Sequence, residues 1–374
     1  MNVKIIGAGS AGIHLAQACC RMGWRVSVVD TSVRALDRFR RIYSDRYQIV
    51  DLTIGLFLSD GVGGASQFED YRTGDAIPDR FDIIMITTPP DVRMKLAIEE
   101  IKKNPRLLHL EKPLCTPNLT GVAEFEAEMK KYPDTIVTVG YNHAVSNSIR
   151  RVADLLNENR IEERKGDGGE FGEILTIDVE FREHWEGAFK AHPWLSGLQD
   201  SYLGYWRRGG GAGNEHSHAL HLFLKLASWA WWWPGESYGL CDLVRKLNVV
   251  SDLAGSQRVE YDRIAHFIMQ MNKGRVGHVT QDVVTKPPRK WARVQGTKGW
   301  LEWHCNGDPA GDVVKYETEN RKVVEIFPKT RPDDFYYEVQ HYDSLLKATN
   351  PCESPLSYRS GLEVMRILNK AYYR

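Results

Sequence analysis

The chain has 374 residues, which is too long for one ordinary hydrophobic core and suits two domains. Its 49 Lys and Arg residues balance 49 Asp and Glu residues. This zero net charge argues against a nucleic-acid partner and gives no electrostatic reason to bind a membrane. The six cysteines form no CxxC pair, so neither a zinc site nor a disulfide framework is indicated. With no cleavable leader in the N-terminal sequence, these features favour a cytoplasmic protein with reduced thiols.

The first part of the chain alternates between strand-like and helix-like segments. The apolar run at 81–87 is typical of a strand buried on both faces of a parallel sheet. Regular alternation of this kind predicts an α/β fold with a doubly wound parallel sheet, a Rossmann domain over residues 1–143. No clear third strand emerges between residues 44 and 80. Strands are predicted over 3–6, 24–29, 81–87, 106–110 and 135–139, and helices over 11–22, 33–43, 91–102 and 119–131.

A glycine-rich GxGxxG turn lies between the first predicted strand and the first predicted helix. Such a turn brings backbone close to a diphosphate, at a helix N-terminus that favours negative charge. Asp30 ends the second strand, where its carboxylate would accept bonds from ribose hydroxyls and repel a 2′-phosphate, so NAD is expected rather than NADP. Asp30 could also cap the next helix, and the two roles are compatible. The expected cofactor contacts here are Gly7, Gly9, Ser10, Ala11, Gly12 and Asp30.

Three further segments follow predicted strands: Thr87–Pro90 (TTPP), Glu111–Pro113 (EKP) and Gly140–His143 (GYNH). The carboxyl ends of strands are where an open α/β sheet binds its ligand. With the glycine turn, these segments resemble the Gfo/Idh/MocA family of NAD(P)-dependent oxidoreductases, typified by glucose–fructose oxidoreductase and inositol dehydrogenase. The resemblance covers essentially the whole chain. It continues through a glycine run at 209–211, a GTKG segment at 296–299 and a final helix after Pro355.

The resemblance implies that Lys112 approaches both the nicotinamide and the reacting hydroxyl. An ammonium there can stabilise an alkoxide as it develops. Pro113 would fix the backbone, with a cis peptide possible, and Glu111 would orient Lys112 or cap a backbone group. The alternative is a solvated lysine in a loop. The further cofactor contacts expected are Thr87, Thr88, Pro89, Glu111, Lys112 and Asn142.

Residues 144–374 are predicted to form a substrate-binding and oligomerisation domain of the α+β class. Strand-like runs follow one another here, which indicates a large, mostly antiparallel sheet. The resemblance implies an open sheet with helices on one face and a homodimer or homotetramer built on the other. A helix is predicted over 145–158, and strands over 174–183, 237–250, 258–272, 276–284, 291–295, 300–304 and 322–327.

The segment 202–221 (YLGYWRRGGGAGNEHSHALH) concentrates residues that can perform chemistry. In the family an acid, often Asp, precedes a histidine by four residues, and Asn214 and His218 fall on these positions. Asn carries no charge, so Glu215 is the alternative supplier of a carboxylate on the same helix face. His218 would shuttle the hydroxyl proton, unless it is a core histidine.

Metal binding is the rival interpretation of that segment, because His216, His218 and His221 form an HxHxxH pattern. On one helix only His218 and His221 would converge, so no metal is predicted. The tryptophans at 229–233 are expected in the core or in a subunit contact. Aromatic faces pack on sugar C–H groups, and Arg207 could bind a phosphate or carboxylate. The expected substrate contacts are His143, His184, Trp185, Trp206 and Arg207.

The sequence therefore predicts an NAD-dependent dehydrogenase that moves a hydride between nicotinamide and a hydroxyl or keto carbon. The substrate class implied by the resemblance is a sugar, a cyclic polyol or a nucleotide-sugar. One alternative is an NAD-dependent glycosidase, which takes and returns the hydride within one cycle. Another is an inactive NAD-binding sensor, which the Asn at position 214 would suit.

Overall fold

The computed structural model describes residues 1–47, 54–59, 65–69, 80–166, 169–231, 240–254, 257–271, 274–348 and 354–373. The chain forms two compact units, Met1–Asn142 with Arg331–Gly361 and His143–Thr330 with Leu362–Arg374. The first break lies one residue from the predicted boundary at 143. The segment 331–361 belongs to the first unit because its helix packs on that unit. The predicted second domain, 144–374, had included this segment. The predicted functions of the two domains stay predictions.

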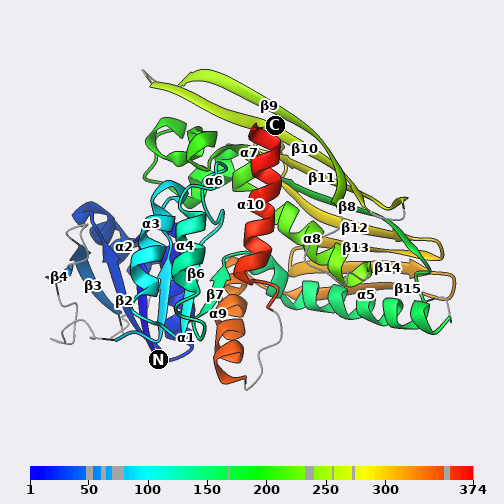
Figure 1. Ribbon diagram of the computed structural model, residues 1–374, viewed down its shortest axis with the longest axis horizontal. Coiled ribbons are helices and arrows are strands. Elements are labelled where there is room, and N and C mark those ends of the chain that lie inside the picture. Colours follow the sequence, from blue (N-terminus) through cyan, green and yellow to red (C-terminus); the bar gives the residue numbers. More distant parts are fainter. Residues whose placement is uncertain are drawn as a thin grey trace. The chain divides into compact units, whose positions relative to one another are not determined.

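The first unit contains a seven-stranded sheet in the order β4-β3-β2-β1-β5-β6-β7 (Figure 1). All neighbouring pairs are parallel except β3 with β4. The predicted doubly wound parallel sheet is therefore confirmed. The strand order reverses between β1 and β5, which is where such sheets bind ligands. The strands are β1 (Asn2–Ile6), β2 (Arg25–Asp30), β3 (Ile54–Ser59), β4 (Ala65–Glu69), β5 (Ile83–Ile86), β6 (Leu107–Leu110) and β7 (Ile136–Val139).

Strands β3 and β4 lie in the stretch where the sequence predicted no clear strand. The run IGLFLS in β3 is short and apolar, and periodicity alone cannot separate such a run from a buried helix segment. A helix near the C-terminus, α9, was also not predicted. The helices of this unit are α1 (Ser10–Arg21), α2 (Val33–Tyr47), α3 (Pro90–Ile101), α4 (Val122–Met129) and α9 (Arg331–Lys347), with the first turn of α10 (Tyr358–Tyr373).

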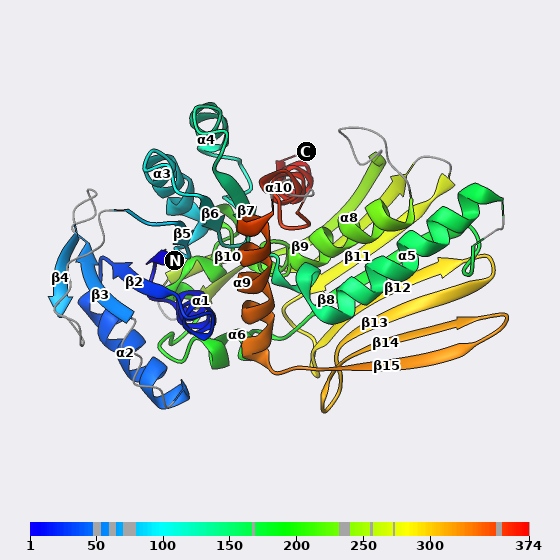
Figure 2. The same ribbon diagram turned by 90° about the horizontal axis from the view of Figure 1, so that it is seen from below.

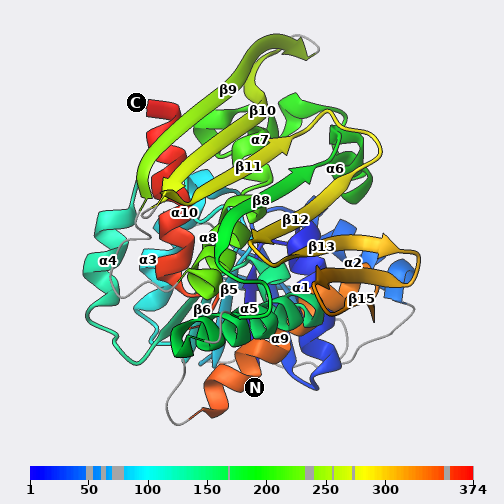
Figure 3. The ribbon, with the colours of Figure 1, turned by 90° about the vertical axis from the view of Figure 1, so that its right-hand side faces the viewer.

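The second unit contains an eight-stranded sheet in the order β15-β14-β13-β12-β8-β11-β10-β9 (Figure 3). Only β8 and β11 pair in parallel among its strand pairs, so the predicted antiparallel character is confirmed. Strand β14 was not predicted. The strands are β8 (Ile174–Arg182), β9 (Leu240–Ala254), β10 (Gln257–Met271), β11 (Val276–Asp282), β12 (Arg289–Gly296), β13 (Gly299–Asp308), β14 (Gly311–Thr318) and β15 (Lys322–Pro328).

Helices α5 (Asn147–Lys165) and α8 (His218–Ala230) cover one face of this sheet (Figure 2). Strand β8 shows why, because Ile177, Val179 and Phe181 alternate with half-buried polar residues and are themselves buried. Trp231 is buried behind α8 and donates from Nε1 to the carbonyl of Ile174 at 2.9 Å, so its predicted place in the core is confirmed. Trp232 and Trp233 lie outside the described residues.

A 3-10 turn at Asn142–Val145 spans the boundary between the two units. Shorter helices complete the second unit: α6 (Trp185–Ala191), α7 (Gly211–Glu215), 3-10 turns at Leu198–Asp200, Tyr202–Gly204 and Trp206–Arg208, and the rest of α10. In the described ranges, no helix combines the length and apolar character that crossing a bilayer requires.

Candidate functional site

The glycine turn after β1 has the geometry that close contact with a ligand requires. Gly7 has a φ of 112° and donates from its N–H to the carbonyl of Val29 at 2.8 Å. A Cβ on Gly12 would lie 2.2 Å from the Gly7 oxygen, so glycine is needed there for the helix to pack on the turn. A Cβ on Gly9 would meet no atom within 4 Å. No side chain caps the start of α1 at Gly9, so its first turn presents backbone N–H groups to an anion.

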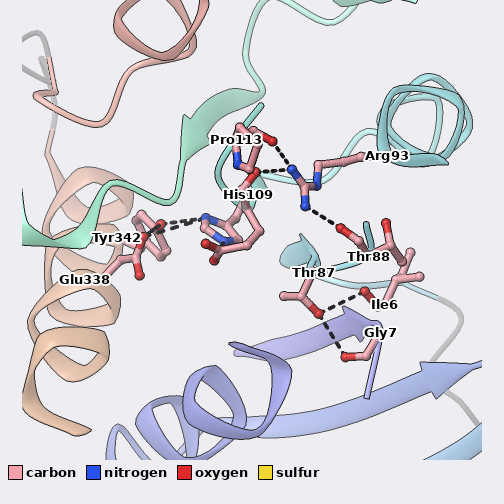
Figure 4. A network of polar contacts seen from close by, with 10 residues as sticks. Ile6, Gly7, Thr87, Thr88, Arg93, His109, Pro113, Glu338 and Tyr342 are labelled. Atoms are coloured by element: carbon pink, nitrogen blue, oxygen red, sulfur yellow. Dashed lines mark hydrogen bonds and ion pairs between the residues drawn. The ribbon is translucent and has the colours of Figure 1, made fainter. Parts of the chain in front are cut away.

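Thr87 at the end of β5 fixes this turn from the other side (Figure 4). Its hydroxyl lies 2.9 Å from the carbonyl oxygen of Gly7 and 3.1 Å from that of Ile6. A Cβ on Gly7 would approach the Thr87 hydroxyl to 2.8 Å, which further explains the glycine. Thr87 therefore orders the turn, and its predicted contact with the cofactor stays a prediction.

Asp30 at the end of β2 accepts two backbone hydrogen bonds. Its Oδ2 accepts from Ala8 N in the glycine turn at 2.8 Å, and its Oδ1 accepts from Ser32 N at 2.9 Å. Ser32 in turn caps α2 through its hydroxyl, which accepts from Ala35 N. Each carboxylate oxygen can accept a further bond, so a ribose contact remains compatible with this structural role.

Arg93 on α3 joins the loops that follow β5 and β6. Its side chain is buried, and it donates to the carbonyl oxygens of Thr88, Glu111 and Pro113 (Figure 4). These bonds fix the backbone on both sides of Lys112, which is half-buried. The peptide bond between Lys112 and Pro113 is cis.

A buried row of polar groups runs from α9 to the carboxylate of Glu111. The hydroxyl of Tyr342 lies 2.7 Å from Oε1 of Glu338 and 2.7 Å from Nδ1 of His109 (Figure 4). On the other side of the imidazole, Nε2 lies 3.7 Å from Oε2 of Glu111. Gly140 makes room for this carboxylate, because a Cβ there would lie 2.8 Å from the same Oε2.

In the second unit, the predicted residues His143 and His218 lie side by side. Their ring centroids are 4.9 Å apart and the planes meet at 76°, an edge-to-face contact. The His218 ring also stacks on Phe181 of β8 at 6.0 Å, and the His143 ring is 5.9 Å from Trp303 of β13. Both imidazoles are half-buried, so a pair of titratable groups rests on an aromatic surface of the sheet.

The single helix expected to carry Asn214, Glu215 and His218 is divided in two. Helix α7 ends at Glu215 and α8 begins at His218. The helical spacing that was to place Asn214 or Glu215 on one face with His218 is therefore interrupted. Asn214 is fully buried and donates from Nδ2 to the Gly210 carbonyl at 2.8 Å and to the Tyr372 hydroxyl at 3.2 Å. Glu215 is half-buried.

A carboxylate that the sequence did not single out lies behind Asn214. Asp262 of β10 is fully buried, and it accepts hydrogen bonds from the Tyr372 hydroxyl at 2.6 Å and from Gly213 N at 2.7 Å. Burial raises the pKa of Asp262 to about 6, although these two bonds oppose the rise. A Cβ on Gly211, which has a φ of 80°, would lie 2.1 Å from Oδ1 of Asp262. The glycine run thus makes room for a buried acid.

The other predicted substrate residues have identifiable structural partners. Strand β8 stops at Arg182, one residue before the predicted end at 183. His184 then caps α6 and accepts from Glu186 N at 3.1 Å. Trp185 begins α6 and is buried in the local core.

Trp206 is also buried, and its ring stacks on Tyr372 with centroids 4.8 Å apart. The Arg207 guanidinium lies 4.3 Å from the Trp206 ring centroid and forms an ion pair with Glu260 at 2.6 Å. For these residues, substrate contact stays a prediction.

The histidines of the HxHxxH pattern differ in burial: His216 and His221 are buried, and His218 is half-buried. Across the ranges that the structure describes, no three or more His, Cys, Asp or Glu side chains are grouped to hold a metal ion.

Sequence reasoning missed several buried polar residues, and two of them left a signal. Arg93 interrupts the apolar face that Ala97 and Ile101 continue, and His109 stands inside the apolar strand LLHL. No local pattern indicated the remaining ones, Asp262, Glu338, Tyr342 and Tyr372. Asp262 and Tyr372 are partners 110 residues apart, and the pair Glu338 and Tyr342 contacts His109 of a distant strand.

No protein-family model matches the chain, and no curated protein matches its sequence. Solved structures resemble it over nearly its full length. An Agrobacterium radiobacter oxidoreductase, solved with NAD+, L-tartaric acid and magnesium, gives a TM-score of 0.65 at 16% identity, covering 100% of this chain and 95% of that one. Levoglucosan dehydrogenase, solved with NADH and levoglucosan, gives a TM-score of 0.65 at 14% identity, covering 99% of this chain and 95% of that one.

UDP-N-acetylglucosamine 3-dehydrogenase GnnA from Acidithiobacillus ferrooxidans gives a TM-score of 0.63 at 14% identity, covering 99% of this chain and 95% of that one. At such identities a likeness establishes the fold. The predicted resemblance is confirmed at that level: the chain has the fold of the NAD-binding oxidoreductases of the Gfo/Idh/MocA type.

Proposed function

We propose that this protein is an NAD-dependent oxidoreductase that moves a hydride between nicotinamide and a hydroxyl-bearing or keto carbon of a sugar, cyclic polyol or nucleotide-sugar. The observation that carries the proposal is the glycine turn at the reversal point of the parallel sheet. It is open at Gly9, leads into an uncapped helix N-terminus and is fixed by Thr87 and Asp30.

The residues of the turn fit a dinucleotide. Backbone N–H groups at the start of α1 would bind its diphosphate, and Asp30 would accept from a ribose hydroxyl. The anionic Asp30 would repel a 2′-phosphate, which favours NAD over NADP. When bound, NAD supplies the hydride acceptor or donor.

Two side chains would manage the substrate hydroxyl. The Lys112 ammonium would stabilise negative charge on the oxygen, and Arg93 holds the turn on both sides of it in one conformation. His218 would take or return the hydroxyl proton, with His143 beside it as a second imidazole. The substrate class is supported by the named substrates of two structural neighbours, levoglucosan and UDP-N-acetylglucosamine.

The face of the eight-stranded sheet opposite α5 and α8 supports a proposed homodimer or homotetramer. Strand register places Val324 and Ile268 on this face, and they are 58% and 44% exposed. Ile326 is 48% exposed on the same face. Sedimentation of the wild type and of Val324→Glu tests the assignment, because a wild-type monomer would exclude it.

The function is tested by titrating NAD and NADP against tryptophan fluorescence and then following NADH absorbance with a panel of sugars, polyols and nucleotide-sugars. Lys112→Ala should lose at least about a hundredfold in turnover and keep its NAD affinity. Lys102→Ala, at an exposed lysine after α3, is the matched control. Failure to bind NAD, or release of a free sugar without net NADH formation, would refute a dehydrogenase.

A further inference from the structure

The buried row Glu338, Tyr342, His109 and Glu111 constrains where its protons lie. Two hydrogen bonds of 2.7 Å meet at the Tyr342 hydroxyl, one shared with Glu338 and one with His109 Nδ1. Each bond needs a proton, and the hydroxyl carries only one. The second proton must therefore come from Glu338 or from Nδ1 of His109.

If His109 carries its proton on Nδ1, Tyr342 donates to Glu338, which is then either ionised or protonated on Oε2, a buried oxygen for which the structure offers that proton no acceptor. In either case a neutral His109 turns a bare Nε2 toward the Glu111 carboxylate at 3.7 Å, so two acceptors face each other, and an ionised Glu338 would add a fully buried anion. A doubly protonated imidazole would satisfy the contacts only with three buried charges. Both arrangements are costly in surroundings where the side chains of His109 and Glu338 are fully shielded from solvent.

The remaining arrangement avoids both costs. Protonated Glu338 donates to Tyr342, Tyr342 donates to Nδ1 of His109, and the Nε2–H of His109 points to the Glu111 carboxylate. Every donor then faces an acceptor, and one negative charge remains at the half-buried end of the row. We infer that Glu338, Tyr342 and His109 form a directed hydrogen-bond chain in which neutral Glu338 is the first donor, and that this chain turns the Nε2–H of His109 toward Glu111, the only anion of the row.

The groups around Glu338 agree with a neutral carboxyl. Burial is the main cause that raises its pKa well above the usual value, and the charges of Glu111 and Asp334 add to the rise. Tyr342 and His109 face it through the contacts above, and from α1 the Cys19 thiol is close enough for Glu338 to raise its pKa. None of these groups is a lysine or an arginine.

This hydrogen-bond chain assigns a positioning role to α9, a helix distant in sequence from Lys112. Glu111 is held at its carbonyl by Arg93, and its carboxylate lies between His109 and Gly140. A fixed Glu111 side chain fixes the turn that presents Lys112. This catalytic consequence rests on the proposed function, whereas the direction of the hydrogen bonds does not.

The direction can be read from the imidazole nitrogens of His109 by NMR on the full-length, 15N-histidine-labelled protein without added ligand. The His109 signals are those missing from His109→Gln, or are assigned through bonds if that variant does not fold. We expect the neutral Nε2–H tautomer when the spectrum is recorded at about pH 8. An Nδ1–H tautomer, or an imidazolium, at that pH would overturn the inference.

Two variants test the links on either side of Tyr342. Glu338→Gln keeps a neutral donor toward the hydroxyl, so the Nε2–H tautomer should persist. Tyr342→Phe removes the donor to Nδ1, so the His109 nitrogen shifts should change. If the folded Tyr342→Phe variant shows unchanged His109 nitrogen shifts, the proposed hydrogen-bond chain is wrong. If that variant does not fold, the wild-type tautomer and the Glu338→Gln spectrum still decide.

The catalytic role has a separate readout. With a substrate that the wild type oxidises, Tyr342→Phe should lower kcat at least about tenfold, leave NAD affinity within about twofold and shift the pH dependence of kcat. Equal loss of kcat and NAD binding would indicate a merely structural role and refute positioning. If the wild type oxidises nothing, the proposed function fails, and the NMR result still stands or falls alone.

Discussion

Asp262→Asn should change the pH dependence of stability in a direction that the structure determines. Folding raises the pKa of this carboxyl from 3.8 to about 6, chiefly through burial. A raised pKa means that the folded state binds a proton that the unfolded state has released. Its stabilising effect is complete below about pH 4 and is lost as the pH rises to about 6. Two pKa units correspond to about 3 kcal/mol, and Asn, which does not titrate, lacks this loss.

The substitution also has a cost that does not depend on pH. Asp262 accepts from Gly213 N and from the Tyr372 hydroxyl, whereas an Asn oxygen can replace only one carboxylate oxygen. The lost bond should cost about 1–3 kcal/mol. The variant should therefore be less stable than the wild type at pH 4 and should recover about 3 kcal/mol relative to it by pH 7.

Urea unfolding at several pH values, followed by tryptophan fluorescence, measures this difference. Of the tryptophans that the structure describes, eight lie in the second unit and Trp24 in the first, so the signal reports mainly on the unit that contains Asp262. The matched control is Asp282→Asn. Burial tends to raise the pKa of Asp282, but hydrogen bonds from Arg182 and Thr285 outweigh it and lower the pKa, so its titration falls below about pH 4. A pH-independent difference for Asp262→Asn would refute the reasoning.

Three further substitutions test the first unit. Gly12→Ala puts a Cβ 2.2 Å from the Gly7 oxygen, so NAD affinity measured by calorimetry should fall more than about tenfold; unchanged affinity would contradict the role of the turn. Arg93→Met leaves carbonyls without their donor and should lower the free energy of unfolding by at least about 2 kcal/mol in urea titrations. Gly140→Ala crowds the Glu111 carboxylate, so it should lower the free energy of unfolding by about 1–3 kcal/mol and shift the His109 NMR signals. Unchanged His109 signals would contradict that packing.

The sequence predicted those parts of the fold that local signals determine. Strand β5 reads as an uninterrupted apolar run, and the glycine spacing after β1 corresponds to a real turn with a positive φ at Gly7. Helix α9 was missed because its buried positions include Glu338 and Tyr342 as well as Val339, so counting apolar residues does not reveal its period. Its stability comes from contacts with α1 and β6, which a local window cannot show.

The candidate site was predicted in its residue types more than in its arrangement. His143 and His218 were both singled out, but nothing in the sequence placed one ring against the other. The expected continuity of the helix from Asn214 to His218 failed at His216 and Ser217, which separate α7 from α8. At this point a carboxylate 49 residues away, Asp262, bonds to Gly213 N, and tertiary contacts of this kind override local propensity.

The return of α9 to the first unit affects how the protein is made. Arg21 pairs with Asp333, His14 stacks on Phe335, and His109 bonds to Tyr342, so this unit includes a segment synthesised after nearly all of the second one. When the first 142 residues leave the ribosome, α9 has not yet been synthesised, so His109 and one side of α1 lack the contacts that α9 provides. The nascent first unit should therefore mature late, and a fragment that stops at residue 142 should depend on chaperones or on α9 added in trans.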